Sequence, residues 1–239
     1  MSEPLLQDQV VMIVGAGRQP APGIAEALAE QGAILAVNDL SPMLLDPLEE
    51  RIRAQSGRIK SYIADATRGM PLRAMIDEIL SDWDRVDVLI NNPRIQPRAE
   101  LISMDEWDWQ RTIEMNLNGP FLVTQLIAQE MEQQGHGVVI NIVDDNPSTL
   151  STPGAGAYAA SQHGLLAFSE AATQEFIAYN IRVYTCCPEE ALLDGHDPGN
   201  TLGGLITYLC GPASIQEAGK VFRVGQASIT PQVNALHQR

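Results

Sequence analysis

Short runs of apolar residues alternate with helical patterns along the chain, and this alternation limits the fold more than any other feature of the sequence. The first unit is an apolar run at 10–14, a glycine-containing turn, apolar residues at helical spacing and a second apolar run at 34–37. Its span, Val10 to Asp39, has the length of a βαβ unit. The pattern continues and predicts seven strands, at 10–14, 34–37, 59–63, 86–90, 138–143, 182–187 and 220–224.

The stretches between these strands predict six helices. The first lies near Ile24, and the others at 43–54, 72–83, 103–134, 155–179 and 202–209. Strands that are joined through helices pair in parallel, and the helices then cover both faces of the sheet. The fold class is therefore α/β, a doubly wound seven-stranded parallel sheet. No linker or repeat divides the 239 residues, so we expect one domain, 1–239.

Composition excludes several classes of partner. Acidic residues outnumber basic ones by 30 to 15, and the net charge of −15 disfavours nucleic acid and anionic membrane surfaces. No apolar run reaches the ~18 residues of a membrane span, and the start of the sequence lacks the basic and apolar regions of a signal peptide. We therefore expect a cytoplasmic protein. Cys186, Cys187 and Cys210 fit neither a disulfide framework nor metal-ligand spacing, so they are expected to be buried free thiols.

Three glycines, Gly15, Gly17 and Gly23, lie between the first strand and the first helix. A turn of this kind can place backbone N–H groups around a diphosphate. Asp39 stands at the end of the second strand, 24 residues after Gly15. A carboxylate in that place accepts hydrogen bonds from ribose hydroxyls and repels a 2′-phosphate, so the pattern favours NAD(H) over NADP(H).

The segment Tyr158–Gln162 resembles the Tyr-x-x-x-Lys motif on the catalytic helix of the short-chain dehydrogenase/reductase family. Together with the glycine turn and Asp39, it makes nearly the whole chain similar to that family. The resemblance implies a Rossmann-like domain with oxidoreductase ancestry that assembles as a dimer or tetramer. It also implies residue roles: Tyr158 and Asn116 in catalysis, and Gly15, Gly17, Gly23, Asp39, Asp65, Asn91, Gln162 and Pro188 at the cofactor.

Two departures from the family pattern concern the proton chemistry. Gln162 stands in the position of the family's lysine, and Asp145 stands thirteen residues before Tyr158, in the position of its serine. The lysine lowers the pKa of the tyrosine by its charge, whereas glutamine is neutral. An aspartate anion near the tyrosine would raise that pKa instead. Both changes act against proton transfer by Tyr158 near neutral pH.

Other departures surround the expected cofactor site. Pro20 and Pro22 lie in the glycine turn, and each removes an N–H that a phosphate could use. Arg94 stands where the family has a small residue, and it is a candidate for the missing positive charge or a partner for Asp144 or Asp145. The segment 189–200, where the family has a substrate lid, is short with little apolar content, so we expect no water-excluding cover there.

The predicted helix 103–134 contains two further signals. Ser103 and Glu106 have the spacing of a capping box at its start. Pro120 lies inside it and has no N–H for the carbonyl of Asn116, so we expect a bend and a free carbonyl that can order a relay water.

Three functional hypotheses remain open. In the first, the chain is a non-catalytic subunit that pairs with an active NAD-dependent dehydrogenase of hydroxyacyl or alcohol substrates, or with itself, through helices 103–134 and 155–179. In the second, it is an atypical but active NAD-dependent enzyme that interconverts a secondary alcohol and a ketone, with Tyr158 as acid and base and Gln162 on the ribose. The third is cofactor-free halohydrin dehalogenation, which needs an arginine where Gln162 stands.

Overall fold

The computed structural model of the chain describes residues 4–92, 94–197, 200–225 and 228–232. Within these residues, eight strands form one sheet in the order β3-β2-β1-β4-β5-β6-β7-β8. The first seven pair in parallel, and β8 pairs antiparallel with β7. The strands are β1 (Val10–Val14), β2 (Ile34–Asp39), β3 (Arg58–Ile63), β4 (Val88–Asn91), β5 (Gly137–Ile142), β6 (Ile181–Pro188), β7 (Val221–Gly225) and β8 (Ser228–Gln232).

The seven predicted strands are all present, and the eighth corrects the prediction of a wholly parallel seven-stranded sheet. Every residue of β8 is exposed, so its sequence shows none of the alternation that marks a half-buried strand. It also contains Pro231, which cannot donate to a ladder and is tolerated on an edge strand. A short exposed edge strand of this kind leaves little signal in the sequence.

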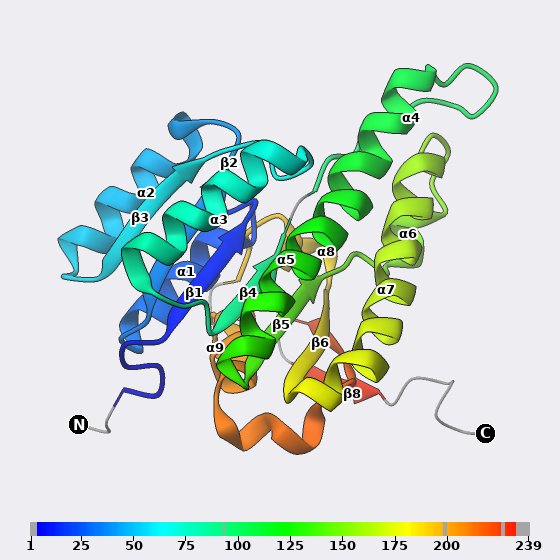
Figure 1. Cartoon of the computed structure of the whole chain (residues 1–239). Coiled ribbons are helices and arrows are strands. Elements are labelled where there is room, and N and C mark those ends of the chain that lie inside the picture. The colour runs from blue at the N-terminus through cyan, green and yellow to red at the C-terminus, as the bar shows by residue number, and fades with distance from the viewer. Residues whose placement is uncertain (1–3, 93, 198–199, 226–227, 233–239) are drawn as a thin grey trace.

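Helices cover both faces of the sheet, as predicted (Figure 1). One face carries α1 (Ala21–Glu30), α2 (Pro42–Ala54), α8 (Glu190–Leu193) and α9 (Thr201–Cys210), and the other carries α3 (Gly69–Trp83), α5 (Gly119–Gln134) and α7 (Gly156–Phe176). Side chains of β1 alternate between the two cores: Val11 and Ile13 face the first group, and Met12 and Val14 the second. Shorter helical turns are α6 (Pro147–Leu150), Ile177–Tyr179 and Pro212–Glu217.

The strand order reverses beside β1. The chain runs outward from β1 through β2 to β3, and then crosses to β4 on the other side of β1. In an open parallel sheet, ligands bind at the carboxyl ends of the strands next to such a reversal. Gly15 follows β1, Asp39 ends β2 and Asn92 follows β4, so the fold gathers these distant residues at one edge.

The long helix predicted at 103–134 is divided into α4 (Glu106–Ile113), a π-helical turn (Glu114–Asn118) and α5. Asp105 caps α4 by accepting from the Trp107 N–H at 2.7 Å, so the expected cap at Ser103 is wrong. The π turn lies just before Pro120, and the Gly119 N–H there reaches back five residues. The chain adapts to the proline by widening a turn.

The segment after β6 is anchored in the core, although its composition is largely polar. Leu192 and Leu193 in α8 are 0% and 2% exposed and belong to the core on the α1 side. The expectation of a segment too polar to cover a site is therefore wrong. Two leucines anchor the segment because both lie on one short helix, α8, and both pack into the core at the edge of the sheet.

Cys186, Cys187 and Cys210 are free and buried, as expected. Within the described ranges, no group of three or more His, Cys, Asp or Glu side chains could hold a metal ion. Over the same ranges, no helix combines the length and apolar character that a membrane span needs.

Candidate active site

The glycine turn after β1 is braced from β4. Gly15 has a φ of +73°, a backbone conformation that glycine adopts without steric cost. The Nδ2 group of Asn92 donates to the carbonyls of Gly15 and Arg18, both at 3.0 Å. The turn is therefore held in shape by the protein itself. Asn92 directly follows Asn91, the residue that the family resemblance placed at the cofactor.

Asp39 braces the same turn from β2. Its Oδ2 accepts from the Gly17 N–H at 3.2 Å, and its Oδ1 accepts from the Leu40 N–H at 2.7 Å. A Cβ on Gly17 would lie 2.3 Å from the Cβ of Leu44 and 3.1 Å from the Asp39 carboxylate, so only glycine fits there. The carboxylate is 5% exposed and fixed where the sequence placed it.

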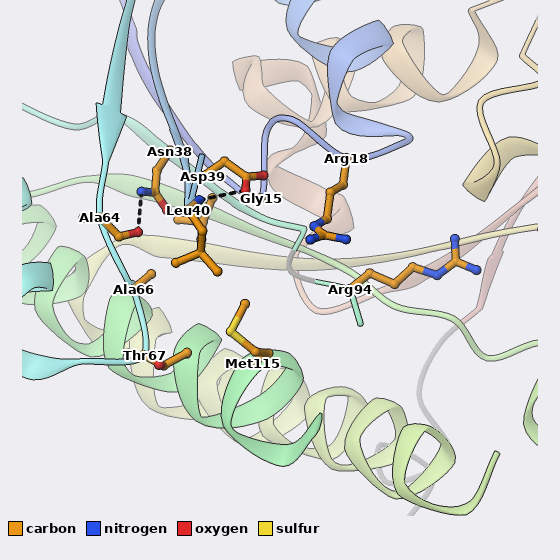
Figure 2. Close-up of a pocket in the computed structure, with 12 residues that line it drawn as sticks. Gly15, Arg18, Asn38, Asp39, Leu40, Ala64, Ala66, Thr67, Arg94 and Met115 are labelled. Atoms are coloured by element: carbon orange, nitrogen blue, oxygen red, sulfur yellow. Dashed lines mark hydrogen bonds between the residues drawn. The ribbon is translucent and has the colours of Figure 1, made fainter. Parts of the chain in front are cut away.

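A cavity lies beside Asp39 at the carboxyl ends of β1 and β2 (Figure 2). The space in it that water could occupy is about 30 Å³, room for one or two water molecules. Figure 2 shows Arg18 and Arg94 together on the opposite side of the cavity from Asp39 and Thr67. Its other lining residues are Val14, Gly15, Asn38, Leu40, Ala64, Ala66, Met115 and Gly119.

Tyr158 lies in the first turn of α7 and is 1% exposed. The Arg94 Nε donates to its hydroxyl oxygen at 3.1 Å, and the hydroxyl donates to Asp144 Oδ2, also at 3.1 Å. Arg94 comes from the segment after β4 and Asp144 from the end of β5. The fold thus joins a cation, a phenol and a carboxyl group from three distant parts of the chain.

The acidic residue beside the tyrosine is Asp144, which corrects the expectation for Asp145. The Asp145 Oδ2 instead pairs with Arg223 Nη2 of β7 at 2.5 Å, and it borders a second cavity with Cys187 and Pro188. Successive side chains of an extended segment point to opposite sides, so a shift of one residue changes the neighbours that a side chain meets. The count of thirteen residues back from Tyr158 therefore could not decide between Asp144 and Asp145.

Two predicted residues hold the neighbours of the tyrosine in place. Gln162 is 3% exposed, and its Oε1 accepts from the Asp144 N–H at 2.8 Å. The side chain of Asn116 accepts from the Ile95 N–H at 2.9 Å and donates to the Ile95 carbonyl at 2.8 Å. Gln162 therefore positions Asp144, and Asn116 positions the backbone next to Arg94. Neither side-chain role was predicted from the sequence.

The turn after α8 covers the site. Arg94 Nη1 donates to the Leu193 carbonyl at 3.3 Å and lies 3.5 Å from Asp194 Oδ1. Gly195 lies against the Gln19 side chain, since a Cβ on this glycine would be 2.6 Å from Gln19 Cδ. The sequence did not predict this cover over Tyr158 and the glycine turn. Its contacts join the long side chains of Arg94 and Gln19 to the backbone of Leu193 and Gly195.

Burial and the neighbouring charges together set the pKa values of Tyr158, Asp144 and Arg94. Burial raises the pKa of Tyr158, Arg94 lowers it and Asp144 adds to the rise, so the phenol stays protonated at neutral pH. Burial also raises the pKa of Asp144, against the Asn146 N–H, Tyr158 and Arg94. For Arg94, burial alone would lower the pKa, but Tyr158, Asp144 and Asp194 outweigh it, and the net pKa is raised.

Six of the eight residues predicted at the cofactor lie outside the lining of the Asp39 cavity, among them Gln162, which bonds to Asp144. Asn91 in β4 is fully buried, and its Nδ2 group donates to Thr124 in α5 and to Asn141 in β5. Pro188 lines the cavity of Asp145, and Gly23 lies in the first turn of α1. Asp65 accepts from the backbone of its own loop. The predicted residues that line the cavity are Gly15 and Asp39, and Gly17 lies behind them, bonded to the Asp39 carboxylate.

Residues 9–192 match the family model for short chain dehydrogenases. The chain belongs to the short-chain dehydrogenase/reductase family. One similar protein is the 3-oxoacyl-[acyl-carrier-protein] reductase FabG of Thermotoga maritima, 32% identical over 187 residues, or 77% of this chain and 74% of that one. The D-threitol dehydrogenase of Mycolicibacterium smegmatis is 27% identical over 192 residues, 80% and 74% of the two chains. The (2S)-[(R)-hydroxy(phenyl)methyl]succinyl-CoA dehydrogenase subunit BbsD of Thauera aromatica is 27% identical over 183 residues, 77% and 73%.

Solved structures of the short-chain dehydrogenase/reductase family confirm the fold. A gluconate 5-dehydrogenase from Burkholderia cenocepacia J2315, in complex with NADP and tartrate, superposes with a TM-score of 0.82 at 27% identity, over 94% of this chain and 96% of that one. A short chain dehydrogenase from Mycobacterium avium gives 0.87 at 20% identity, over 96% and 86%. The family is one of oxidoreductases that use nicotinamide cofactors, and the resemblance seen in the sequence is confirmed.

The residues of the site fit one end of the family's cofactor better than the other. At the adenosine end, the Asp39 carboxylate borders the cavity, and Gly17 lets Leu44 and Asp39 pack closely against the glycine turn. At the other end, Arg94 and the turn at 193–195 fill the space. A whole dinucleotide therefore requires these two parts to move and the small cavity beside Asp39 to widen.

The raised pKa of Asp144 predicts a pH-dependent gain in stability for Asp144→Asn. Below its unfolded value of 3.8 the carboxyl group is neutral in both states, and above its raised folded value the full cost of a buried charge is present. The variant should therefore gain about 1 kcal/mol in unfolding free energy at about pH 8 and almost nothing at about pH 3.5. Urea unfolding at both pH values tests this, and an equal change at both would contradict it. Asp145→Asn, which breaks the pair with Arg223, should lose stability rather than gain it.

Proposed function

We propose that this short-chain dehydrogenase/reductase interconverts a secondary alcohol and a ketone with NAD(H), with Tyr158 as the acid and Arg94 in the electrostatic role of the family's lysine. The contact that carries this proposal is the 3.1 Å hydrogen bond from Arg94 Nε to the Tyr158 hydroxyl oxygen. A cation in that place stabilises the phenolate that forms when the tyrosine gives up its proton. Gln162 has no charge with which to do this.

The protonation state of Tyr158 suits the direction of reduction. The phenol carries the proton that the oxygen of a ketone needs, and because burial raises its pKa and makes it a weaker acid, release of that proton depends on the charge of Arg94. The cofactor, when bound, supplies the hydride to the carbonyl carbon. Arg94 then faces a phenolate, and its charge offsets the cost of that anion in a buried site.

Access to the tyrosine requires a movement. At 1% exposure, the hydroxyl group of Tyr158 meets a substrate only after Arg94 or the turn at 193–195 shifts. Arg94 is joined to this cover by one hydrogen bond and one long ion pair with an exposed carboxylate, Asp194. Exposed ion pairs contribute roughly 0–1 kcal/mol. Arg94 is therefore easily released from the cover, whereas Leu192 and Leu193 keep α8 anchored in the core.

The cofactor preference follows from Asp39. Asp39→Asn keeps an oxygen that can accept from the Gly17 N–H but removes the charge that repels a 2′-phosphate. We expect the ratio of NADPH to NADH affinity to rise by about tenfold, equal to about 1.4 kcal/mol. Fluorescence titrations with both cofactors measure it. Asp46→Asn, an exposed carboxylate on α2, is the matched control and should leave the ratio unchanged.

The experiment that tests the proposed function is NADH oxidation by the purified chain alone with two groups of carbonyl compounds. The relatives' names direct the choice to 3-oxoacyl thioesters and to ketoses. We expect steady consumption of NADH with members of one group. No consumption with either group, at cofactor concentrations that saturate the protein, would contradict the proposal.

A second candidate is a non-catalytic subunit that accompanies an active relative. It is favoured by the contact between Tyr158 and Asp144, since an anion beside the tyrosine opposes loss of its proton. The relative in Thauera aromatica is named as a subunit of a dehydrogenase, and this supports a pairing of the same kind for this chain. Exposed apolar residues on the helices of the expected interface, Trp107, Phe121 and Tyr179, would meet the partner. NADH consumption only after a homologous dehydrogenase is added would favour this candidate.

A further inference from the structure

Asp144 is the buried acid closest to the reacting group, and three hydrogen bonds hold it there. Its Oδ2 accepts from the Tyr158 hydroxyl at 3.1 Å, and its Oδ1 accepts from the Asn146 N–H at 3.0 Å. Its own N–H donates to Gln162 Oε1 at 2.8 Å. The residue is 2% exposed. The carboxyl group is therefore held in one orientation, with one oxygen on the tyrosine.

No ion pair within the described ranges neutralises the Asp144 carboxyl group. Arg94 pairs with Asp194 and reaches Asp144 only through the tyrosine, and Asp145 is paired with Arg223. The charged groups that face Asp144 are Arg94, which opposes the uptake of a proton, and Asp145, which favours it. A buried carboxyl group without an ionic partner exchanges its proton more readily than one held in a salt bridge.

We propose that Asp144 returns a proton to Tyr158 after each reduction, through the hydrogen bond that joins the two side chains. This inference rests on the proposed function. During reduction the proton of the phenol moves to the carbonyl oxygen as a hydride reaches the carbonyl carbon. The phenolate then takes the proton of the Asp144 carboxyl group, and the resulting carboxylate regains one from water when the cover opens. The O–H bond broken at each step is matched by one formed.

Among the described contacts of Tyr158, Asp144 is the only group suited to this task. Arg94 holds its protons at all pH values that a folded protein tolerates. Gln162 and Asn116 carry amides, which neither gain nor lose protons near neutrality. In the family, the resemblance assigns a serine and a lysine to this neighbourhood. Here a carboxyl group stands against the phenol, so the route of the proton differs from the one that those residues provide.

The first test needs neither substrate nor cofactor. Infrared spectra of the chain across a pH series report the carbonyl stretch of protonated carboxyl groups. Because the pKa of Asp144 is raised, we expect a band that persists to higher pH than the bulk of the surface acids. The band should be absent in Asp144→Asn and present in Asp145→Asn. A spectrum that is the same in wild type and in Asp144→Asn would overturn the inference.

The second test separates proton return from the reduction itself. In the first turnover Tyr158 uses its own proton, so Asp144→Asn should keep a first-turnover rate within about twofold of wild type and lose about tenfold or more in steady state. Stopped-flow NADH absorbance measures both phases at a pH where the infrared band of Asp144 is present. Equal slowing of the two phases would indicate a purely structural role and would contradict the inference.

The two tests also distinguish failure of the inference from failure of the proposed function. An infrared band that Asp144→Asn removes, together with no turnover by the wild-type chain, would reject the proposed function and the proton return with it. Turnover by the wild-type chain without such a band would leave the proposed function standing and reject the role of Asp144.

Discussion

Tyr158→Phe is expected to lower the rate of NADH-dependent reduction by about a hundredfold to ten-thousandfold, the range for loss of a positioned general acid. The substitution removes one oxygen atom from a side chain that is 1% exposed and keeps the ring that packs in the first turn of α7. Cofactor affinity should change little, because the adenosine end of the site is built by Asp39 and the glycine turn. Steady-state rates and an NADH titration of the same preparation measure the two effects.

Stability is the control for this variant. Loss of the hydroxyl group leaves Arg94 Nε and Asp144 Oδ2 without their shared partner, which should cost about 1–3 kcal/mol of unfolding free energy. The fold should survive this cost at assay temperature. A Tyr158→Phe protein that is folded and retains the wild-type rate would exclude the tyrosine as the acid.

Arg94→Gln is expected to lower the rate by about tenfold to a hundredfold, since each pKa unit of lost phenolate stabilisation corresponds to about 1.4 kcal/mol. Loss of the cation removes the main influence that lowers the pKa of Tyr158, so that pKa should rise further. The pKa of Asp144 should rise as well, because the same cation lowers it. The pH profile of the reduction should therefore shift toward higher pH.

Arg94→Lys separates the charge of Arg94 from its hydrogen bonds. Lysine keeps the positive charge but cannot reproduce the planar group that reaches both the tyrosine and the Leu193 carbonyl. A rate between those of the wild type and Arg94→Gln would show that charge carries part of the effect. If Arg94→Gln were as active as the wild type, the assigned role of Arg94 would be wrong.

Much of the fold was predictable because it depends on patterns that repeat. Buried strands in a parallel sheet read as short apolar runs, and helices between them carry apolar residues at helical spacing. The position of Asp39 was predictable for the same reason, since a residue at the end of the second strand must lie at the carboxyl edge of the sheet. The aromatic residue of the site, Tyr158, was evident from the family motif.

The rest of the site depends on single residues and tertiary contacts that no pattern records. Asp144 and Asp145 are adjacent, and which one faces the tyrosine is decided by the direction of one side chain after β5. The cover by α8 depends on two leucines and a bond from Arg94 to a backbone carbonyl. β8 is exposed along its whole length, so its sequence lacks the apolar pattern by which a buried strand is predicted.

The most direct test of the account is an NADH titration of the purified chain on its own, followed by cofactor fluorescence. The adenosine end of the site is already shaped by Asp39, Gly17 and Asn92, and Arg94 is joined to the cover by only one hydrogen bond and one long ion pair. We therefore predict saturable binding by the chain alone, weakened in Asp39→Ala. No binding by the isolated chain, with binding restored only when a homologous dehydrogenase is added, would contradict the account and favour a non-catalytic subunit.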